Sequence, residues 1–176
     1  MLVAALALGL AAAPAPRTSA ATGAVDLTLA QLRALIGQPE QAAADGLAVG
    51  YSLACAPPAA AAGQVEVSCR FARMLGRTAI HPDFELAGRI PIRELRLKVE
   101  DGRIAGLSFR TSVDSYDAVQ DLLAKVYGPP KLTRGVIHTE LGSRDQVKLV
   151  WSGAGHAARV VDPAPPDLGL MVDLGG

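Results

Sequence analysis

Aromatic residues, histidine and cysteine are scarce in this sequence, and there is no excess of either charge. Among 176 residues there are only three Phe, three Tyr and one Trp. A core at this length is therefore built mainly from Leu, Val and Ile. Lysine plus arginine equals aspartate plus glutamate, at 17 each. This balance removes the electrostatic reason to expect nucleic acid or an anionic membrane surface as a partner.

The same scarcity bears on metal and cofactor chemistry. A protein metal site needs ligands at fixed spacing, with cysteines or carboxylates completing the set. Only three histidines are present, and they are scattered: His81, His138 and His156. We therefore expect no metal ion and no cofactor, and predict that these histidines are solvated or bonded locally.

Residues 1–21 have the pattern of a signal peptide. Residues 1–13 are uninterrupted apolar or small, and prolines and a small-residue cleavage zone ending at Ala20 or Ala21 follow. The run is shorter than the roughly 20 apolar residues that a membrane-spanning helix needs. No Lys or Arg precedes the apolar run, although the n-region of a signal peptide normally contains one. The alternative interpretation of residues 1–21 is a disordered alanine-rich tail. We expect a periplasmic or secreted protein with no stable membrane span after cleavage.

The two cysteines lie in segments that alternate like β-strands, at residues 47–55 and 65–71. If these strands pair about the centre of the intervening loop, Cys55 lies opposite Cys69, and Leu53 lies opposite Phe71. Directly opposed residues have Cα atoms roughly 4.5–5.5 Å apart, at or near the disulfide range. We predict a disulfide, with two buried free thiols as the alternative. The spacing is unlike the redox motif C-x-x-C.

Two segments predict helices. Thr28 and Gln31 have the spacing of a capping box, apolar residues follow at helical intervals, and Gly37 and Pro39 end the segment. The second helix is clearer, because apolar residues lie at positions i, i+3, i+4 and i+7: Val119, Leu122, Leu123 and Val126.

Three carboxylates crowd the start of the second helix: Asp114, Asp117 and Asp121. They suggest a cation site, but stabilisation by the helix dipole explains them adequately. Three aromatic residues near this helix and the next strands are candidates for a contact surface, with partly buried core edges as the alternative: Tyr116, Tyr127 and Trp151.

The remaining strands are predicted from alternation and turns. Asp101-Gly102 predicts a two-residue hairpin turn, and the change of parity after Ile104 predicts a bulge at Ala105-Gly106. Residues 74–89 show no sustained period and are expected to form a long connection. Later strands are expected at residues 134–141, 146–151, 157–162 and 168–174.

This order predicts an α+β fold, an antiparallel sheet with two main helices packed on one face. Residues 22–112 and 113–176 would each form a helix-plus-sheet half. When the glycines after the two helices are aligned, leucines and prolines align as well: Leu32, Gly37 and Pro39 with Leu123, Gly128 and Pro130. This agreement suggests two repeats of one unit, and chance similarity of two helix ends is the alternative.

Residues 28–39, TLAQLRALIGQP, resemble the signature of SmpA/OmlA-like outer-membrane assembly lipoproteins (BamE), in which a capped helix ends in Leu-Gly-x-Pro. The strand-turn-strand segment 97–109 resembles their later hairpin. Tandem copies of such a unit are similar to the secreted β-lactamase inhibitor proteins. The resemblance implies an envelope domain that binds through its sheet surface, and it assigns no binding residue. This sequence has no lipid-attachment cysteine near the cleavage zone.

We therefore expect a binding or assembly module that recognises a protein or envelope component and is not an enzyme. A hydrolase is one alternative, assembled from Ser152, His156 and Asp162, but the Gly-x-Ser-x-Gly nucleophile motif is absent. A carrier of a small molecule or lipid, with a cavity between sheet and helices, is the other. No catalytic residue is assigned, and the one predicted site is the disulfide of Cys55 and Cys69.

Overall fold

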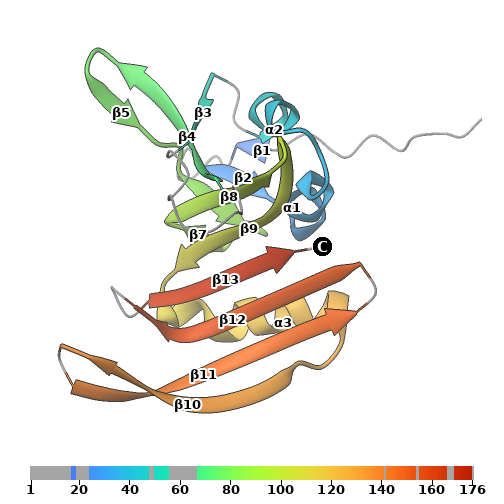
Figure 1. Cartoon of the computed structure of the whole chain (residues 1–176), viewed down its shortest axis with the longest axis vertical. Coiled ribbons are helices and arrows are strands. Elements are labelled where there is room, and N and C mark those ends of the chain that lie inside the picture. The colour runs from blue at the N-terminus through green and yellow to red at the C-terminus, as the bar shows by residue number, and fades with distance from the viewer. Residues whose placement is uncertain are drawn as a thin grey trace, which may run out of the picture.

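The computed structural model describes residues 17–18, 24–47, 50–55, 67–140, 142–153, 155–165 and 169–175 (Figure 1). Strands account for 60% of it and helices for 21%. The expected α+β class is therefore wrong, because the fold is largely β, with two sheets and one helix of substantial length. Apart from Arg17 and Thr18, the predicted signal peptide lies outside the described residues.

The larger sheet contains nine strands, and all of its pairings are antiparallel. Its order is β10-β11-β12-β13-β9-β8-β4-β3, and β5 pairs with β4 at one end. The strands are β3 (Ser52–Cys55), β4 (Val67–Leu75), β5 (Thr78–Ile80), β8 (Glu94–Glu100), β9 (Arg103–Thr111), β10 (Lys131–Thr139), β11 (Gly142–Gly153), β12 (His156–Ala164) and β13 (Gly169–Gly175).

This strand order is symmetrical about the β9–β13 pair. Strands β3, β4, β8 and β9 come from the first expected half, and strands β10 to β13 come from the second. The last strand of each half therefore pairs with the other, so one continuous sheet crosses the expected boundary at residues 112–113. The duplication itself stays a prediction.

A smaller sheet contains four strands in the order β1-β2-β6-β7. Its strands are β1 (Arg17–Thr18), β2 (Val25–Leu27), β6 (Phe84–Leu86) and β7 (Ile90–Ile92). Two strands, β5 and β6, fall within residues 74–89, so the prediction of a long connection there is wrong. Each has only three residues, and alternation over three residues is too short to be recognised in a sequence.

The helices are short except for the last. They are α1 (Leu29–Leu35), α2 (Glu40–Leu47), the 3₁₀ turn η1 (Val113–Ser115) and α3 (Tyr116–Tyr127). The capping box of α1 is confirmed, since Thr28 Oγ1 accepts from the Gln31 amide at 3.2 Å and Gln31 Oε1 accepts from the Thr28 amide at 2.7 Å. Gly37, with φ +84°, follows directly after its C-cap residue.

The strand expected at residues 47–55 begins later than predicted, because Leu47 is the last residue of α2. Alternating small and apolar residues fit either structure, and alanine is the strongest helix former. In the helix, Ala43 and Leu47 are four residues apart on one face, and both are buried.

Helix α3 packs on one face of the larger sheet. Its residues Val119 and Leu123 are buried there, and Trp151 Nε1 on β11 donates to the carbonyl oxygen of Gly128 at 2.8 Å. Tyr116 and Tyr127 pack partly buried against the same core. The interpretation of these aromatic residues as core edges is therefore confirmed, and they form no exposed contact surface.

Three local predictions in the first half are confirmed. Asp101 and Gly102, with φ values of +50° and +72°, form the turn between β8 and β9. The register of this pair shifts between Lys98 and Val99, which leaves Ala105 as the extra residue of a bulge. Cys55 and Cys69 are opposed in register and form a disulfide, with Cα atoms 4.0 Å apart.

The disulfide closes a loop of 14 residues in sequence separation, which predicts a large contribution to stability. In the chain-entropy model a loop of this size is worth about 3 kcal/mol. We expect the double variant Cys55→Ala/Cys69→Ala to lose about that much free energy of unfolding, measured by urea denaturation. Adding reductant should lower the stability of the wild type and leave the variant unchanged; a variant as stable as the oxidised wild type would contradict the prediction.

Candidate binding surface

The face of the larger sheet opposite α3 is the candidate binding surface, and we refer to it as the open face. Side chains alternate along each strand, so residues between buried core positions lie on this face. In β8 the buried residues Leu95, Leu97 and Val99 alternate with residues 94, 96, 98 and 100. In Figure 1, α3 lies behind β11 and β12, so the view is onto the open face of these strands.

Strand register aligns the open-face residues into rows across the sheet. One row carries long polar and charged side chains over β4, β8, β9, β13 and β12: Arg70, Arg96, Ser108, Asp173 and Arg159. The adjacent row carries small residues over β9, β13 and β12: Gly106, Gly175 and Ala157. Because the small residues lie beside a row of large side chains, the open face has a depression over the small residues.

This depression, which we name the hollow, has a volume of about 420 Å³. Gly106, Ala157 and Gly175 form its floor. Lys98 and Glu100 of β8 line one side. The opposite side is lined by Val150 and by an ion pair, in which Arg159 Nη2 lies 2.6 Å from Asp173 Oδ2.

Gly106 is required by the close approach of β9 to β13. A Cβ atom at this position would lie 2.8 Å from the carbonyl oxygen of Leu174, which real Cβ contacts essentially never reach. Only glycine therefore permits this pairing without displacement of the backbone, and the floor of the hollow depends on it.

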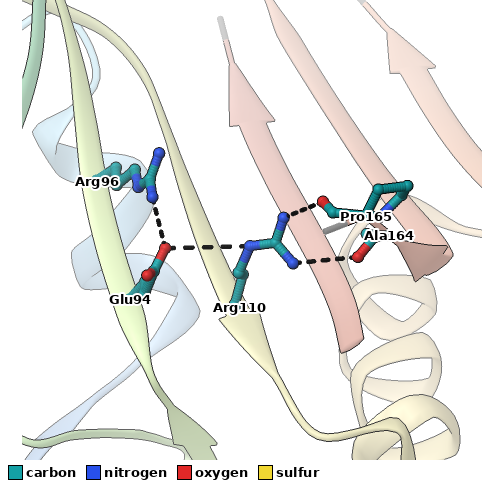
Figure 2. A network of polar contacts seen from close by, with 5 residues as sticks. All are labelled: Glu94, Arg96, Arg110, Ala164 and Pro165. Carbon is teal, nitrogen blue, oxygen red and sulfur yellow. Dashed lines mark hydrogen bonds and ion pairs between the residues drawn. The ribbon is translucent and has the colours of Figure 1, made fainter. Parts of the chain in front are cut away.

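A polar network crosses the open face beside the hollow (Figure 2). Glu94 Oε2 accepts from Arg96 Nη2 at 2.7 Å and lies 4.0 Å from Arg110 Nε. Arg110 also donates to the carbonyl oxygens of Ala164, at 3.2 Å, and of Pro165. The network therefore links β8 and β9 to the end of β12.

Basic side chains outnumber acidic ones on the open face, although the whole chain has no net charge. Among the residues that the structure describes, the acidic ones on this face are Glu94, Glu100 and Asp173. The basic ones are Arg70, Arg96, Lys98, Arg103, Arg110, Lys131, Arg144, Lys148 and Arg159. This asymmetry was invisible in the composition, because it depends on which side of each strand a residue lies.

The three residues considered for a hydrolase do not all come together, because Asp162 lies far from Ser152. Ser152 pairs with Ala157, and Asp162 pairs with Val147, five positions away along β11. This separation corresponds to about 16 Å, and the odd spacing places the two side chains on opposite faces of the sheet. The side chain of His156 lies outside the described residues.

The described histidines make local hydrogen bonds, as predicted. His81 Nδ1 lies 2.7 Å from the carbonyl oxygen of Phe71, and His138 Nδ1 lies 2.8 Å from Ser143 Oγ. In the part of the chain that the structure describes, the one group of closely spaced potential metal ligands contains Glu40, Cys55 and Cys69. Its two sulfur atoms are bonded to each other, so they are not free to act as thiolate ligands.

The carboxylates at the start of α3 are exposed to solvent: Asp114, Asp117 and Asp121. Beneath the same helix, burial raises the pKa of the Asp162 carboxyl. Burial also raises the pKa of Tyr116, and the negative charge of Asp162 adds to this effect.

Comparison with known proteins supplies no relative, since no family model, curated protein or solved structure matches the chain. No described helix has the length and apolar character needed to cross a membrane. The hollow was missed in the sequence because its three small residues lie far apart in the chain. Their strand alternation was the available signal, but only the strand order places them in one row.

Replacing Gly106 tests the close approach of β9 and β13. We expect Gly106→Ala to lose about 1–3 kcal/mol of unfolding free energy, because the added methyl group collides with backbone. Gly135→Ala in β10 is the matched control, since nothing lies within 4 Å of its Cβ position. The control should change stability by less than about 0.5 kcal/mol in urea denaturation. Equal effects at the two positions would contradict the prediction.

Asp162→Asn tests the partly buried carboxyl of Asp162. A raised pKa means that the folded chain holds a proton at pH values where the unfolded chain has released it. Stability from this group therefore falls as pH rises from about 3.9, the ordinary aspartate value, through the folded pKa. We expect the variant to be more stable than the wild type near neutral pH and to lose this advantage at about pH 3. Thermal unfolding of the variant and the wild type at both pH values measures the difference in stability. An equal gain in stability at both pH values would show that the raised pKa of Asp162 is not its cause.

Proposed function

We propose that this chain is an exported binding module that recognises a protein, or a protein component of the cell envelope, through the open face. The observation that carries the proposal is the hollow in the middle of a broad sheet face that no described helix covers. Protein interfaces concentrate their binding energy where an anchor side chain of one partner fills a pocket in the other. The hollow, at about 420 Å³, is large enough to accept such a side chain.

The charges of the open face as a whole favour a partner whose surface is acidic. Basic residues prevail on the open face, and opposite charges across an interface speed association and select between partners. The ion pair of Arg159 and Asp173 at the rim adds a hydrogen-bond donor and a hydrogen-bond acceptor beside the hollow, where the partner's side chain would be inserted. Binding by this face should therefore weaken as salt is added.

Export is part of the proposal. The signal-like pattern at residues 1–21 and the disulfide of Cys55 and Cys69 both suit an oxidising compartment outside the cytoplasm. The absence of a membrane-spanning helix among the described residues is compatible with a periplasmic or secreted module.

The two alternatives gain no support from a particular observation. The separation of Ser152 from Asp162 argues against the hydrolase that these residues suggested. The space between α3 and the sheet is filled by Val119, Leu123 and Trp151, which argues against a carrier cavity there. A binding role for the open face accounts for the hollow and the basic charge around it, which neither alternative explains.

The proposal predicts that filling the hollow abolishes binding. Ala157 is exposed on the hollow floor, so Ala157→Leu places a larger side chain in the cavity without disturbing the core. Thr133→Leu introduces the same side chain on the same face at exposed edge strand β10, outside the hollow. We expect immobilised wild-type protein and Thr133→Leu to retain the same proteins from an envelope extract, and Ala157→Leu to lose them.

Two further measurements make this test decisive. Circular dichroism and thermal unfolding should show that both variants fold like the wild type. Proteins retained through the open face should elute as salt is raised, because the surrounding charges are exposed. Retention of the same proteins by Ala157→Leu, or no specific retention by the wild type, would argue against the proposed function.

A further inference from the structure

A second cavity lies where strand β4 leaves strand β8. The two strands pair from Val67 to Arg70, and from Arg73 onward β4 pairs with β5 instead. The β4–β5 hairpin extends away from the body of the molecule in Figure 1. Between the diverging strands a pocket of about 190 Å³ opens, which we name the cleft. It shares no lining residue with the hollow.

One wall of the cleft is apolar. Phe71, Phe84 and Leu95 line it and are otherwise buried in the core. The rings of Phe71 and Phe84 meet edge to face, with centroids 5.7 Å apart. Pro82 adjoins them in the lining. A short hydrocarbon chain or a single aromatic ring would find a preformed apolar surface here.

The other wall carries positive charge. Arg70 and Arg93 line the cleft, and the guanidinium of neither forms an ion pair or hydrogen bond with any described residue. Arg70 also lies directly opposite Arg96 across the β4–β8 pair. Like charges at opposed positions destabilise a sheet unless an anion lies near them.

Among the described lining residues Glu94 supplies the one carboxylate, and it neutralises Arg96 but is bound to neither Arg70 nor Arg93. Glu94 accepts from Arg96 at 2.7 Å and lies within 4.0 Å of Arg110, so its charge is already shared by two guanidinium groups (Figure 2). His81 is also engaged, since its Nδ1 donates to the carbonyl oxygen of Phe71 at 2.7 Å. An excess of positive charge therefore remains at Arg70 and Arg93.

We infer that the cleft binds an organic carboxylate with a short apolar or aromatic body. Guanidinium groups match carboxylates in geometry and form strong charge-assisted hydrogen bonds with them. The apolar wall lies beside the two arginines, so one molecule of modest size reaches both. A volume of about 190 Å³ admits a ring or side chain with its carboxylate, and is smaller than the pockets of drug-sized ligands.

A carboxylate attached to an apolar or aromatic body occurs in two kinds of ligand: a free organic acid and the C-terminal residue of a peptide. The probes are 3-phenylpropionate, 3-phenylpropionamide and the peptide acetyl-Ala-Ala-Phe with a free or an amidated terminus. Each is titrated into the ¹⁵N-labelled, disulfide-bonded protein while amide chemical shifts are followed. We expect both acids to shift residues 70–71 and 93–95, and the amides to bind at least about tenfold more weakly. Tighter binding of the peptide acid identifies a chain terminus as the source, and binding of 3-phenylpropionate alone identifies a free acid.

Variants distinguish binding in the cleft from a general attraction of anions to basic residues. Arg93→Gln and Arg70→Gln should each weaken binding of 3-phenylpropionate by about tenfold or more. Arg77→Gln is the matched control, because Arg77 is exposed in the β4–β5 turn, away from the cleft. The filled-hollow variant Ala157→Leu should bind the acid normally, so this test stands apart from the proposed function.

Several outcomes would overturn the inference. They are equal binding of acid and amide, the same loss in Arg77→Gln as in Arg93→Gln, and no shift at residues 70–71 and 93–95 with any acid. Inorganic phosphate binding as tightly as 3-phenylpropionate would also overturn it, since the apolar wall would then contribute nothing. Arg93 is exposed, so its replacement should leave the dispersed spectrum of the folded protein intact.

Discussion

The pairing of β9 with β13 is the contact on which the rest of this structure depends. Each strand is the last of its half, and their antiparallel register joins two separate groups of antiparallel strands into one sheet. Gly106 makes the contact sterically acceptable, because a side chain there would meet the backbone of Leu174. Without this pairing both halves would end in unpaired edge strands, and the open face would be two narrow faces without the hollow between them.

Local features of the fold were predictable from the sequence, and long-range ones were not. The capping box at Thr28, the turn at Asp101-Gly102 and the disulfide register depend on residues close together in the chain or on strict strand parity. The fold class was mispredicted because α1 has only seven residues and the strands of the smaller sheet have two or three. Such elements are stabilised by tertiary packing, which no local pattern encodes.

The candidate surface shows the same division between local and long-range information. Alternation along β8 and β9 was visible in the sequence and indicates that Lys98 and Gly106 lie on a common face. The alignment of Gly106 with Gly175 and Ala157 depends instead on strand order, which brings residues about 70 positions apart into register. Charge behaves likewise: a chain with no net charge carries a predominantly basic face, because strand parity sorts the two signs onto different sides.

Both candidate sites arise where the regular sheet is interrupted. The hollow forms where small residues replace large ones in a row, and the cleft forms where β4 departs from β8. The disulfide lies directly beside this departure, since Cys69 precedes Arg70 and binds β4 to β3 on its other side. Beyond this point β4 is held by its pairing with β3 and β5, and the covalent bond adds to the β3 pairing. The disulfide therefore does more than close a loop: it ties to β3 the strand that carries Arg70, a lining residue of the cleft.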